Sequence, residues 1–470
     1  MRKGLIVVLS ALLVVAFALP AMADLSTSGF IRVKARMQQN YNGTGASGLF
    51  ILPSKDPATA TYVEQRQRFI FDWNMENAGG RAYFEIDFGA WGDSAYTVGR
   101  NQGAGLEGDS INLETKNFYL WFKVPNTSLK FQVGLQNQTD SYDGVIFGVA
   151  DMAGIFVTGT MEPVSYRLGW AKWQEGSTTV DNDVDLYVAE AKFSPTKEAK
   201  LGVNFYLIRD ASGETALAGG QTNLNSIFNR LSLAYLGVGA PAVVYSPSNF
   251  YYVGVDGSVK AGPVAVSGWA FYNFGKIEDP TPGGSDTDLK AFAGSLRGDM
   301  DLGPGKFFLA GAYVSGTSDS DSDFKTPITG NQYALAGSFP FYKWDLQILW
   351  PNGDDINASA ALAYDANNYG RGAVTFAAGY KQKFSDMLSG KIGAGYLADA
   401  ENILGSPVKK HKAIEINANV NYAVVKGIDL GLYGAYAFLT DWEDFTSSGA
   451  DLTQDADDVF KVYARLNYGF

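Results

Sequence analysis

The chain has 470 residues; 46% of them are hydrophobic, 14% are aromatic, 54 are glycine and none is cysteine. The formal net charge of −12 argues against nucleic-acid binding, and the lack of cysteine excludes a disulfide framework. After the N-terminus, no apolar run is long enough to cross a membrane as a helix, so any membrane span must consist of strands.

The N-terminus has the features of an export signal. Arg2 and Lys3 precede an apolar run that ends near Leu19, and Ala21-Met22-Ala23 supplies the small residues of a cleavage site. The run is too short, and too closely followed by polar residues, to be a retained membrane helix. We therefore expect residues 1–23 to be a cleaved signal peptide and residues 24–470, which begin at Asp24, to form a single domain.

From Gly29 onward, polar and apolar residues alternate in short segments, which is the pattern of strands with two different faces. The pattern predicts strands over Gly29–Gln38, Tyr62–Glu76, Arg81–Trp91, Leu113–Val124, Leu129–Gln136, Ile155–Met161, Ser165–Trp173, Asp185–Phe193, Lys200–Arg209, Tyr251–Lys260, Ala265–Phe274, Leu289–Asp301, Lys306–Gly316, Gln332–Phe339, Trp344–Trp350, Ala373–Phe384, Lys391–Leu397, Ala413–Tyr422, Ile428–Leu439 and Asp458–Phe470. The alternation is weak over Ile155–Met161, Gln332–Phe339 and Trp344–Trp350, so we predict about 18 strands, with 16 or 20 as alternatives.

Short and long connections follow each other along the chain. Asn77–Gly80 and Glu162-Pro163 are short, whereas Asn40–Thr61, Gly92–Asn112 and Asp210–Asn249 are long and polar. Outer-membrane barrels have short turns on the periplasmic side and long loops outside, and a soluble sandwich has no reason to keep this rhythm. Together with the export signal, the pattern predicts an all-β fold, a transmembrane antiparallel β-barrel in the bacterial outer membrane with an aqueous lumen.

Basic residues gather on the polar faces of the first three predicted strands and of the last one. They are Arg32, Lys34, Arg36, Arg66, Arg68, Arg81, Lys461 and Arg465. Barrel closure brings the last strand beside the first, so we expect one basic patch on the pore wall, where charge would set ion selectivity. Glu64, Asp72, Glu85 and Asp87 lie nearby, and the alternative is that these are simply paired, solvated charges.

The segment Asn137–Gly154 combines three acidic residues, Asp140, Asp143 and Asp151, with an apolar middle over Val145–Val149. A solvated loop would not need this apolar middle, whereas a loop folded inward against the barrel wall would. We therefore predict an inward-folded constriction loop whose carboxylates oppose the basic patch. A further strand or a subunit contact is the alternative.

The chain ends on the alternating segment VFKVYARLNYGF. Leu466, Tyr468 and Phe470 belong to its apolar row, which would face lipid. A final strand with a terminal aromatic residue resembles the assembly signal of outer-membrane proteins. That resemblance implies recognition by the barrel-assembly machinery.

The segments YVEQRQRF and NFYLWFKVPNTSLKFQVGLQNQ, followed by the acidic and apolar loop, resemble the trimeric outer-membrane porins of sulfate-reducing and related Gram-negative bacteria. The resemblance implies a homotrimer in which each subunit holds a pore for passive diffusion of small hydrophilic solutes and ions. It assigns Arg66 and Arg68 to the pore wall, and Asp140 and Asp143 to the constriction loop. Lipopolysaccharide, outer-membrane lipid and periplasmic chaperones are the further partners it implies.

Other functions have less support in the sequence. A basic pore could make the protein a solute-selective channel that prefers anions or carboxylates, and a structural or adhesive barrel would have similar loops. The only histidine, His411, offers no catalytic triad, and no set of histidines or cysteines suggests a metal site. We therefore expect no catalytic residues, no metal and no cofactor.

Overall fold

The computed structural model describes residues 24–40, 51, 53–88, 91–92, 113–175, 178, 181–212, 248–277, 286–318, 321–334, 337–352, 361–402, 410–446 and 449–470. The predicted signal peptide, residues 1–23, lies outside this part of the chain, as do residues 93–112, 213–247 and 353–360 of the long connections. Within the described residues, no helix has the length and apolar character needed to cross a membrane.

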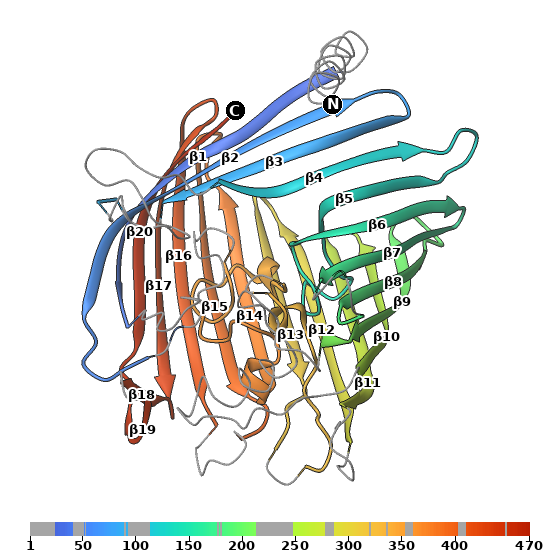
Figure 1. The fold of residues 1–470 in the computed structure, drawn as a ribbon. Coiled ribbons are helices and arrows are strands. Elements are labelled where there is room, and N and C mark those ends of the chain that lie inside the picture. The colour runs from blue at the N-terminus through green and yellow to red at the C-terminus, as the bar shows by residue number, and fades with distance from the viewer. Residues whose placement is uncertain are drawn as a thin grey trace, which may run out of the picture.

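The described chain forms one closed antiparallel barrel (Figure 1). Its strands are β1 (Asp24–Gln39), β2 (Thr59–Asn74), β3 (Ala78–Phe88), β4 (Leu113–Lys123), β5 (Lys130–Gln138), β6 (Ala150–Met161), β7 (Val164–Gln174), β8 (Val184–Phe193), β9 (Ala199–Asp210), β10 (Ser248–Ala261), β11 (Val264–Ile277), β12 (Thr287–Leu302), β13 (Gly305–Val314), β14 (Ala373–Lys383), β15 (Leu388–Asp399), β16 (Lys412–Val425), β17 (Ile428–Thr440) and β20 (Val459–Gly469). Each strand pairs with the next in sequence, and β1 also pairs with β20, so the predicted count of 18 is confirmed.

Both β1 and β20 reach the end of the barrel that carries the short turns. Asp24 pairs with Asn74 at the end of β2, and Phe30 pairs with Gly469 at the end of β20. The opposite end carries the long connections and a separate hairpin of β18 (Glu443–Thr446) and β19 (Gly449–Asp455) (Figure 1). The predicted rhythm of short and long connections therefore corresponds to the two ends of the barrel.

The strands have an apolar outer face. The inner face is largely polar on β1 to β3, β16 and β20, and largely apolar on β8 to β13. On β16, Ile414 and Ile416 are each 50% exposed, whereas Glu415 and Asn417 between and beyond them are buried. Outward-facing aliphatic and aromatic residues recur around the barrel, as a lipid-facing surface requires. The apolar row of the last strand, with Leu466, Tyr468 and Phe470, lies on this outer face.

Two of the twenty predicted strands are wrong. Gln332–Phe339 and Trp344–Trp350 belong to the connection between β13 and β14, residues 315–372, and their described residues lie inside the barrel (Figure 1). The described residues of this connection include three short 3-10 helices, η3 (Gly330–Gln332), η4 (Tyr342–Trp344) and η5 (Asn368–Gly370). Most of its described residues between 326 and 350 are buried, with Lys343 and Asp345 among the exposed exceptions, so this stretch needs apolar residues without alternation. The weak prediction over Ile155–Met161 is confirmed, because this segment is part of β6.

Candidate functional site

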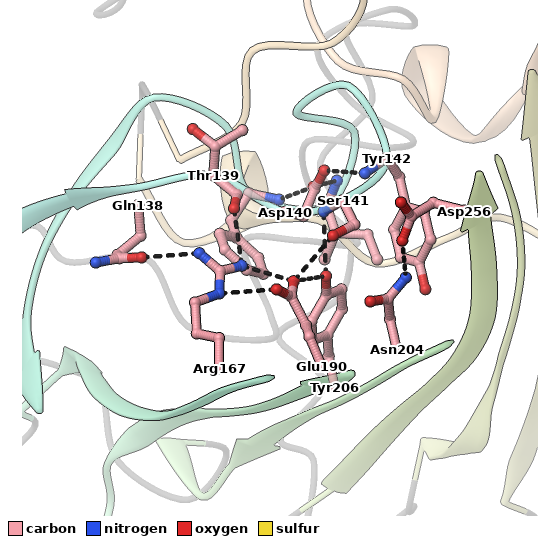
Figure 2. A network of polar contacts seen from close by, with 12 residues as sticks. Gln138, Thr139, Asp140, Ser141, Tyr142, Arg167, Glu190, Asn204, Tyr206 and Asp256 are labelled. Atoms are coloured by element: carbon pink, nitrogen blue, oxygen red, sulfur yellow. Dashed lines mark hydrogen bonds and ion pairs between the residues drawn. The ribbon is translucent and has the colours of Figure 1, made fainter. Parts of the chain in front are cut away.

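The loop between β5 and β6, residues 139–149, folds into the barrel around the carboxylate of Asp140 (Figure 2). Its Oδ1 accepts hydrogen bonds from the backbone N–H groups of Tyr142 and Gly144, at 2.7 and 3.0 Å. Its Oδ2 accepts from Ile146 and Phe147, at 2.6 and 2.8 Å. Burial raises the pKa of Asp140 to about 6, although the four backbone hydrogen bonds favour the ionised form. Asp140 therefore fixes the conformation of the loop by accepting hydrogen bonds from its backbone.

The apolar side of this loop packs against the barrel wall. Val145, Ile146 and Phe147 are fully buried, which confirms the predicted inward fold. The ring of Tyr142 lies 5.0 to 5.6 Å from the rings of Tyr206, Trp269 and Phe271. Gly254 on β10 permits this approach, because a Cβ atom there would lie 2.5 Å from the Tyr142 hydroxyl. The loop is thus fixed across the inner faces of β9 to β11.

Arg167 and Glu190 hold the start of this loop, and neither was identified from the sequence. The Arg167 guanidinium donates to Gln138 and to the Thr139 carbonyl, each at 2.9 Å, and forms an ion pair with Glu190 (Figure 2). Glu190 also accepts from Ser141 Oγ at 3.1 Å. Alternation places Arg167 and Glu190 on the inner faces of β7 and β8, and that period-two pattern was the available signal.

The other two predicted loop acids have different surroundings. Asp143 accepts a hydrogen bond from Trp269 Nε1 at 3.1 Å and forms an ion pair with Lys343 at 3.2 Å. Burial lowers the pKa of Lys343, but the charges and hydrogen bonds of Asp143 and Tyr342 together outweigh this effect, so the pKa is raised overall. Asp151 lies in β6 rather than in the loop, and forms an ion pair with Lys116 at 2.9 Å.

The β5–β6 loop and the β13–β14 connection form one unit inside the barrel. The N–H of Gly330 donates to the carbonyl of Ile146 at 2.7 Å. The N–H groups of Phe339 and Phe341 donate to the carbonyls of Gly144 and Asp143, at 3.0 and 3.1 Å. Because these are backbone hydrogen bonds, a change in the position of one segment must alter the other.

Buried acids fix the β13–β14 connection to the wall. The Glu415 carboxylate on β16 accepts the N–H groups of Gln347, Ile348 and Leu349, at 2.7 to 3.0 Å. The Gln347 side chain also accepts a hydrogen bond from Tyr463 Oη on β20, at 3.1 Å. These contacts hold the connection against the β16 to β20 side of the barrel.

The single histidine belongs to a buried cluster where this connection meets β14. His411 Nε2 lies 2.6 Å from Glu443, its ring stacks on Trp442, and its Nδ1 contacts Arg371. Arg371 is fully buried and lies 3.5 Å from Asp399. This histidine, which directly precedes β16, is therefore a buried structural residue.

The predicted basic residues all lie on the inner face, but in two groups. Lys34, Arg36, Arg66 and Lys461 are at most 4% exposed. Lys34 and Arg36 both contact Glu64, at 3.7 and 2.6 Å. Arg66 lies 3.6 Å from Glu85. Because these cations are buried, they can influence a solute in the lumen only through their electrostatic field.

The second group is partly exposed to the lumen and consists of Arg32, Arg68, Arg81 and Arg465. The Arg68 guanidinium pairs with Glu85 and lies between the rings of Phe30 and Tyr83, at 5.3 and 5.6 Å. Arg81 pairs with Asp72 at 2.7 Å. In the described residues, no ion pair joins Arg66 or Arg68 to the acids of the β5–β6 loop.

Comparison with known proteins identifies the fold. No protein-family profile and no curated protein sequence matches the chain significantly. Among solved structures, OccAB4 of Acinetobacter baumannii has 12% identity and a TM-score of 0.52, and the match covers 96% of this chain and 99% of that one. OccK8 (OprE) of Pseudomonas aeruginosa has 12% identity, a TM-score of 0.53, and coverage of 95% and 98%. OpdK of the same organism, crystallised with vanillate, has 11% identity, a TM-score of 0.50, and coverage of 95% and 98%.

These three proteins are outer-membrane porins. The chain therefore has the fold of an outer-membrane porin, an 18-stranded antiparallel barrel. The inner face of this barrel and the two segments folded into it form the candidate site.

Proposed function

We propose that the protein is an outer-membrane porin, a water-filled pore for passive diffusion of small hydrophilic solutes and ions. The observation that carries the proposal is the closed barrel with an apolar outer face, an arginine-bearing inner face and two segments folded inside. An apolar band facing lipid around a polar interior is the arrangement of a transmembrane pore. The infolded segments narrow the path, so that passing solutes come close to charged side chains.

A preference for anions is the second candidate function. Arg32, Arg68, Arg81 and Arg465 are the predicted wall residues that retain exposure to the lumen, and they would attract carboxylates and other small anions. OpdK, a barrel of similar fold, was crystallised with vanillate, which is a carboxylate. In this proposal Arg66 and the other enclosed cations add to the positive electrostatic potential of the lumen. Lys343 of η4, which is paired with Asp143, also contributes positive charge.

The remaining parts of the proposal concern location and assembly. Export through cleavage of residues 1–23, insertion by the barrel-assembly machinery and contact with lipopolysaccharide are proposed from the sequence pattern alone. A homotrimer of the type found in sulfate-reducing bacteria rests on the resemblance of YVEQRQRF and the following strands. The solved porins of similar fold come from Pseudomonas and Acinetobacter, which supports the porin class but not this narrower family. An enzymatic role has no support from these channel proteins.

The direct test is conductance of the purified protein in a planar lipid bilayer. We expect stable open channels, with a reversal potential in a salt gradient that indicates anion preference. The preference should decrease as salt rises, because ions screen exposed charges. A protein that inserts but shows no open channel would leave the structural or adhesive barrel as the function.

A further inference from the structure

A chamber of about 680 Å³ lies between the β13–β14 connection and the barrel wall, near the end with the short turns. Tyr342, Asp345 and Asn352 of the connection form one side. Inward-facing residues of β14 to β17 and β20, with the turn between β14 and β15, form the other side. A chamber of this size can enclose most of a small organic solute.

The charged residues of this chamber leave one cation without a carboxylate. Asp345 pairs with Lys391 at 3.2 Å, Asp386 with Lys383 at 2.7 Å, and Asp429 with Arg465 at 3.0 Å. The fourth cation, Lys381, forms no ion pair or hydrogen bond with the described residues. Its ammonium group is therefore available to a solute in the chamber.

Lys381 also lies between two other lysines, each of which is paired with a carboxylate of its own, Lys391 with Asp345 and Lys306 with Asp301. In the strand register it lies directly opposite Lys391 on β15 and directly opposite Lys306 on β13. Like charges in directly opposed positions destabilise a sheet. An anion held between Lys381 and Lys391, which both line the chamber, would remove this repulsion.

Uncharged hydrogen-bonding groups continue the same row. Asn419 on β16 lies opposite Lys391 on one side and opposite Tyr433 on the other. Its side-chain carbonyl accepts from the Asn421 amide at 3.0 Å, and none of the described residues accepts a hydrogen bond from its own amide N–H groups, which can donate into the chamber. The Asp345 carboxylate on the facing connection can accept. A donor and an acceptor together suit hydroxyl groups, which do both.

We propose that this chamber binds a small anion that also carries several hydroxyl groups, such as a sugar acid or a sugar phosphate. Lys381 and Lys391 hold the anionic end, and Asn419 and Asp345 bond the hydroxyls. The inference rests on the proposed channel function, because it places a binding step on the solute's path beyond the infolded segments.

The test is calorimetric titration of the detergent-solubilised full-length protein with gluconate, hexanoate, glucose and glucose 6-phosphate. Gluconate and hexanoate share charge and chain length but differ in hydroxyl groups, whereas glucose has hydroxyls and no charge. We expect gluconate to bind at least about tenfold more tightly than hexanoate or glucose. The comparison with glucose 6-phosphate decides whether a carboxylate or a phosphate is the preferred anionic end.

Variants localise the binding. Lys381→Gln should weaken gluconate binding about tenfold, and Asn419→Ala should weaken binding of gluconate but not of hexanoate. Lys192→Gln is the matched control, because Lys192 is a partly exposed lysine of β8 that lies outside the chamber. Equal affinity for gluconate and hexanoate, or gluconate binding unchanged in Lys381→Gln, would overturn the inference.

Conductance in a bilayer separates this inference from the channel itself. A conducting protein that binds no hydroxylated anion refutes the chamber site alone. If the protein binds gluconate but never conducts, the proposed channel function is refuted and the proposed binding site in the chamber is still supported.

Discussion

Replacing Asp140 with alanine should release the β5–β6 loop from the lumen. The Asp140 carboxylate accepts four backbone N–H groups at 2.6 to 3.0 Å, and all of them lie in a buried loop. Each donor left unsatisfied costs roughly 1–3 kcal/mol, so the four together cost roughly 4–12 kcal/mol. The methyl side chain of alanine cannot accept these hydrogen bonds.

A compensating gain partly offsets this loss. The pKa of Asp140 is raised to about 6, from 3.8, so the charge itself is unfavourable in the folded loop near neutral pH. A shift of this size corresponds to about 3 kcal/mol, which alanine regains. The net effect is a destabilisation of at least about 1 kcal/mol, concentrated in a loop that has no strand pairing of its own.

Single-channel conductance and limited proteolysis measure the outcome. We expect Asp140→Ala to conduct more than the unaltered protein and to be cut within residues 139–149. Asp143→Ala is the matched control, because its side chain bonds Trp269 and Lys343 rather than the loop backbone. If Asp140→Ala keeps both the original conductance and the protease resistance of the loop, the carboxylate does not hold the loop.

Three further predictions follow from the same geometry. Arg68→Gln should shift the permeability ratio toward cations at low salt. Arg66→Gln should mainly lower the melting temperature, because Arg66 is enclosed beside Glu85. Equal shifts in ion selectivity in the two variants would contradict these different roles of Arg66 and Arg68. The raised pKa of Asp140 means that the infolded loop is most stable in acid and loses stability as pH rises through about 6. The fluctuations of the single-channel current should therefore be smaller at about pH 4 than at about pH 8. Asp140→Asn should weaken this pH dependence. Deleting Phe470 should reduce assembly into the membrane, because its backbone pairs with Gly29 and its ring lies on the outer face, while any assembled protein should keep its original conductance.

Alternation predicted the strands and their faces because each barrel strand contacts two different environments. On β20, Tyr463 faces the lumen and bonds the β13–β14 connection, while Leu466 faces outward and is 48% exposed. The same reasoning failed over Trp344–Trp350, where Trp344 and Trp350 are both 1% exposed. A segment packed inside its own barrel has apolar surroundings on most sides, so its apolar residues show no clear periodicity. Its secondary structure therefore cannot be predicted from alternation.

Alternation also gives the face of a residue without giving its depth. Arg66 and Arg68 are two residues apart on one face of β2, and both contact Glu85, yet Arg66 is 4% exposed and the Arg68 side chain is 28% exposed. The difference depends on what lies against each guanidinium in three dimensions. For Arg68 this includes the rings of Phe30 and Tyr83 from neighbouring strands. A sequence can therefore predict a basic wall, but it cannot say which cations meet the solute.

The acids inside the barrel show why loop carboxylates were harder to interpret than wall arginines. A strand satisfies its backbone N–H groups through its neighbours, whereas an infolded connection has few such partners and must use side chains. Asp140 accepts four N–H groups and Glu415 accepts three, while the buried Asp365, with a pKa raised to about 6 by burial, bonds Thr329 and Gln332. A carboxylate is the side chain that can accept several such bonds at once. An acidic residue surrounded by apolar loop residues is thus better explained as an acceptor for its own backbone than as a charge presented to the pore.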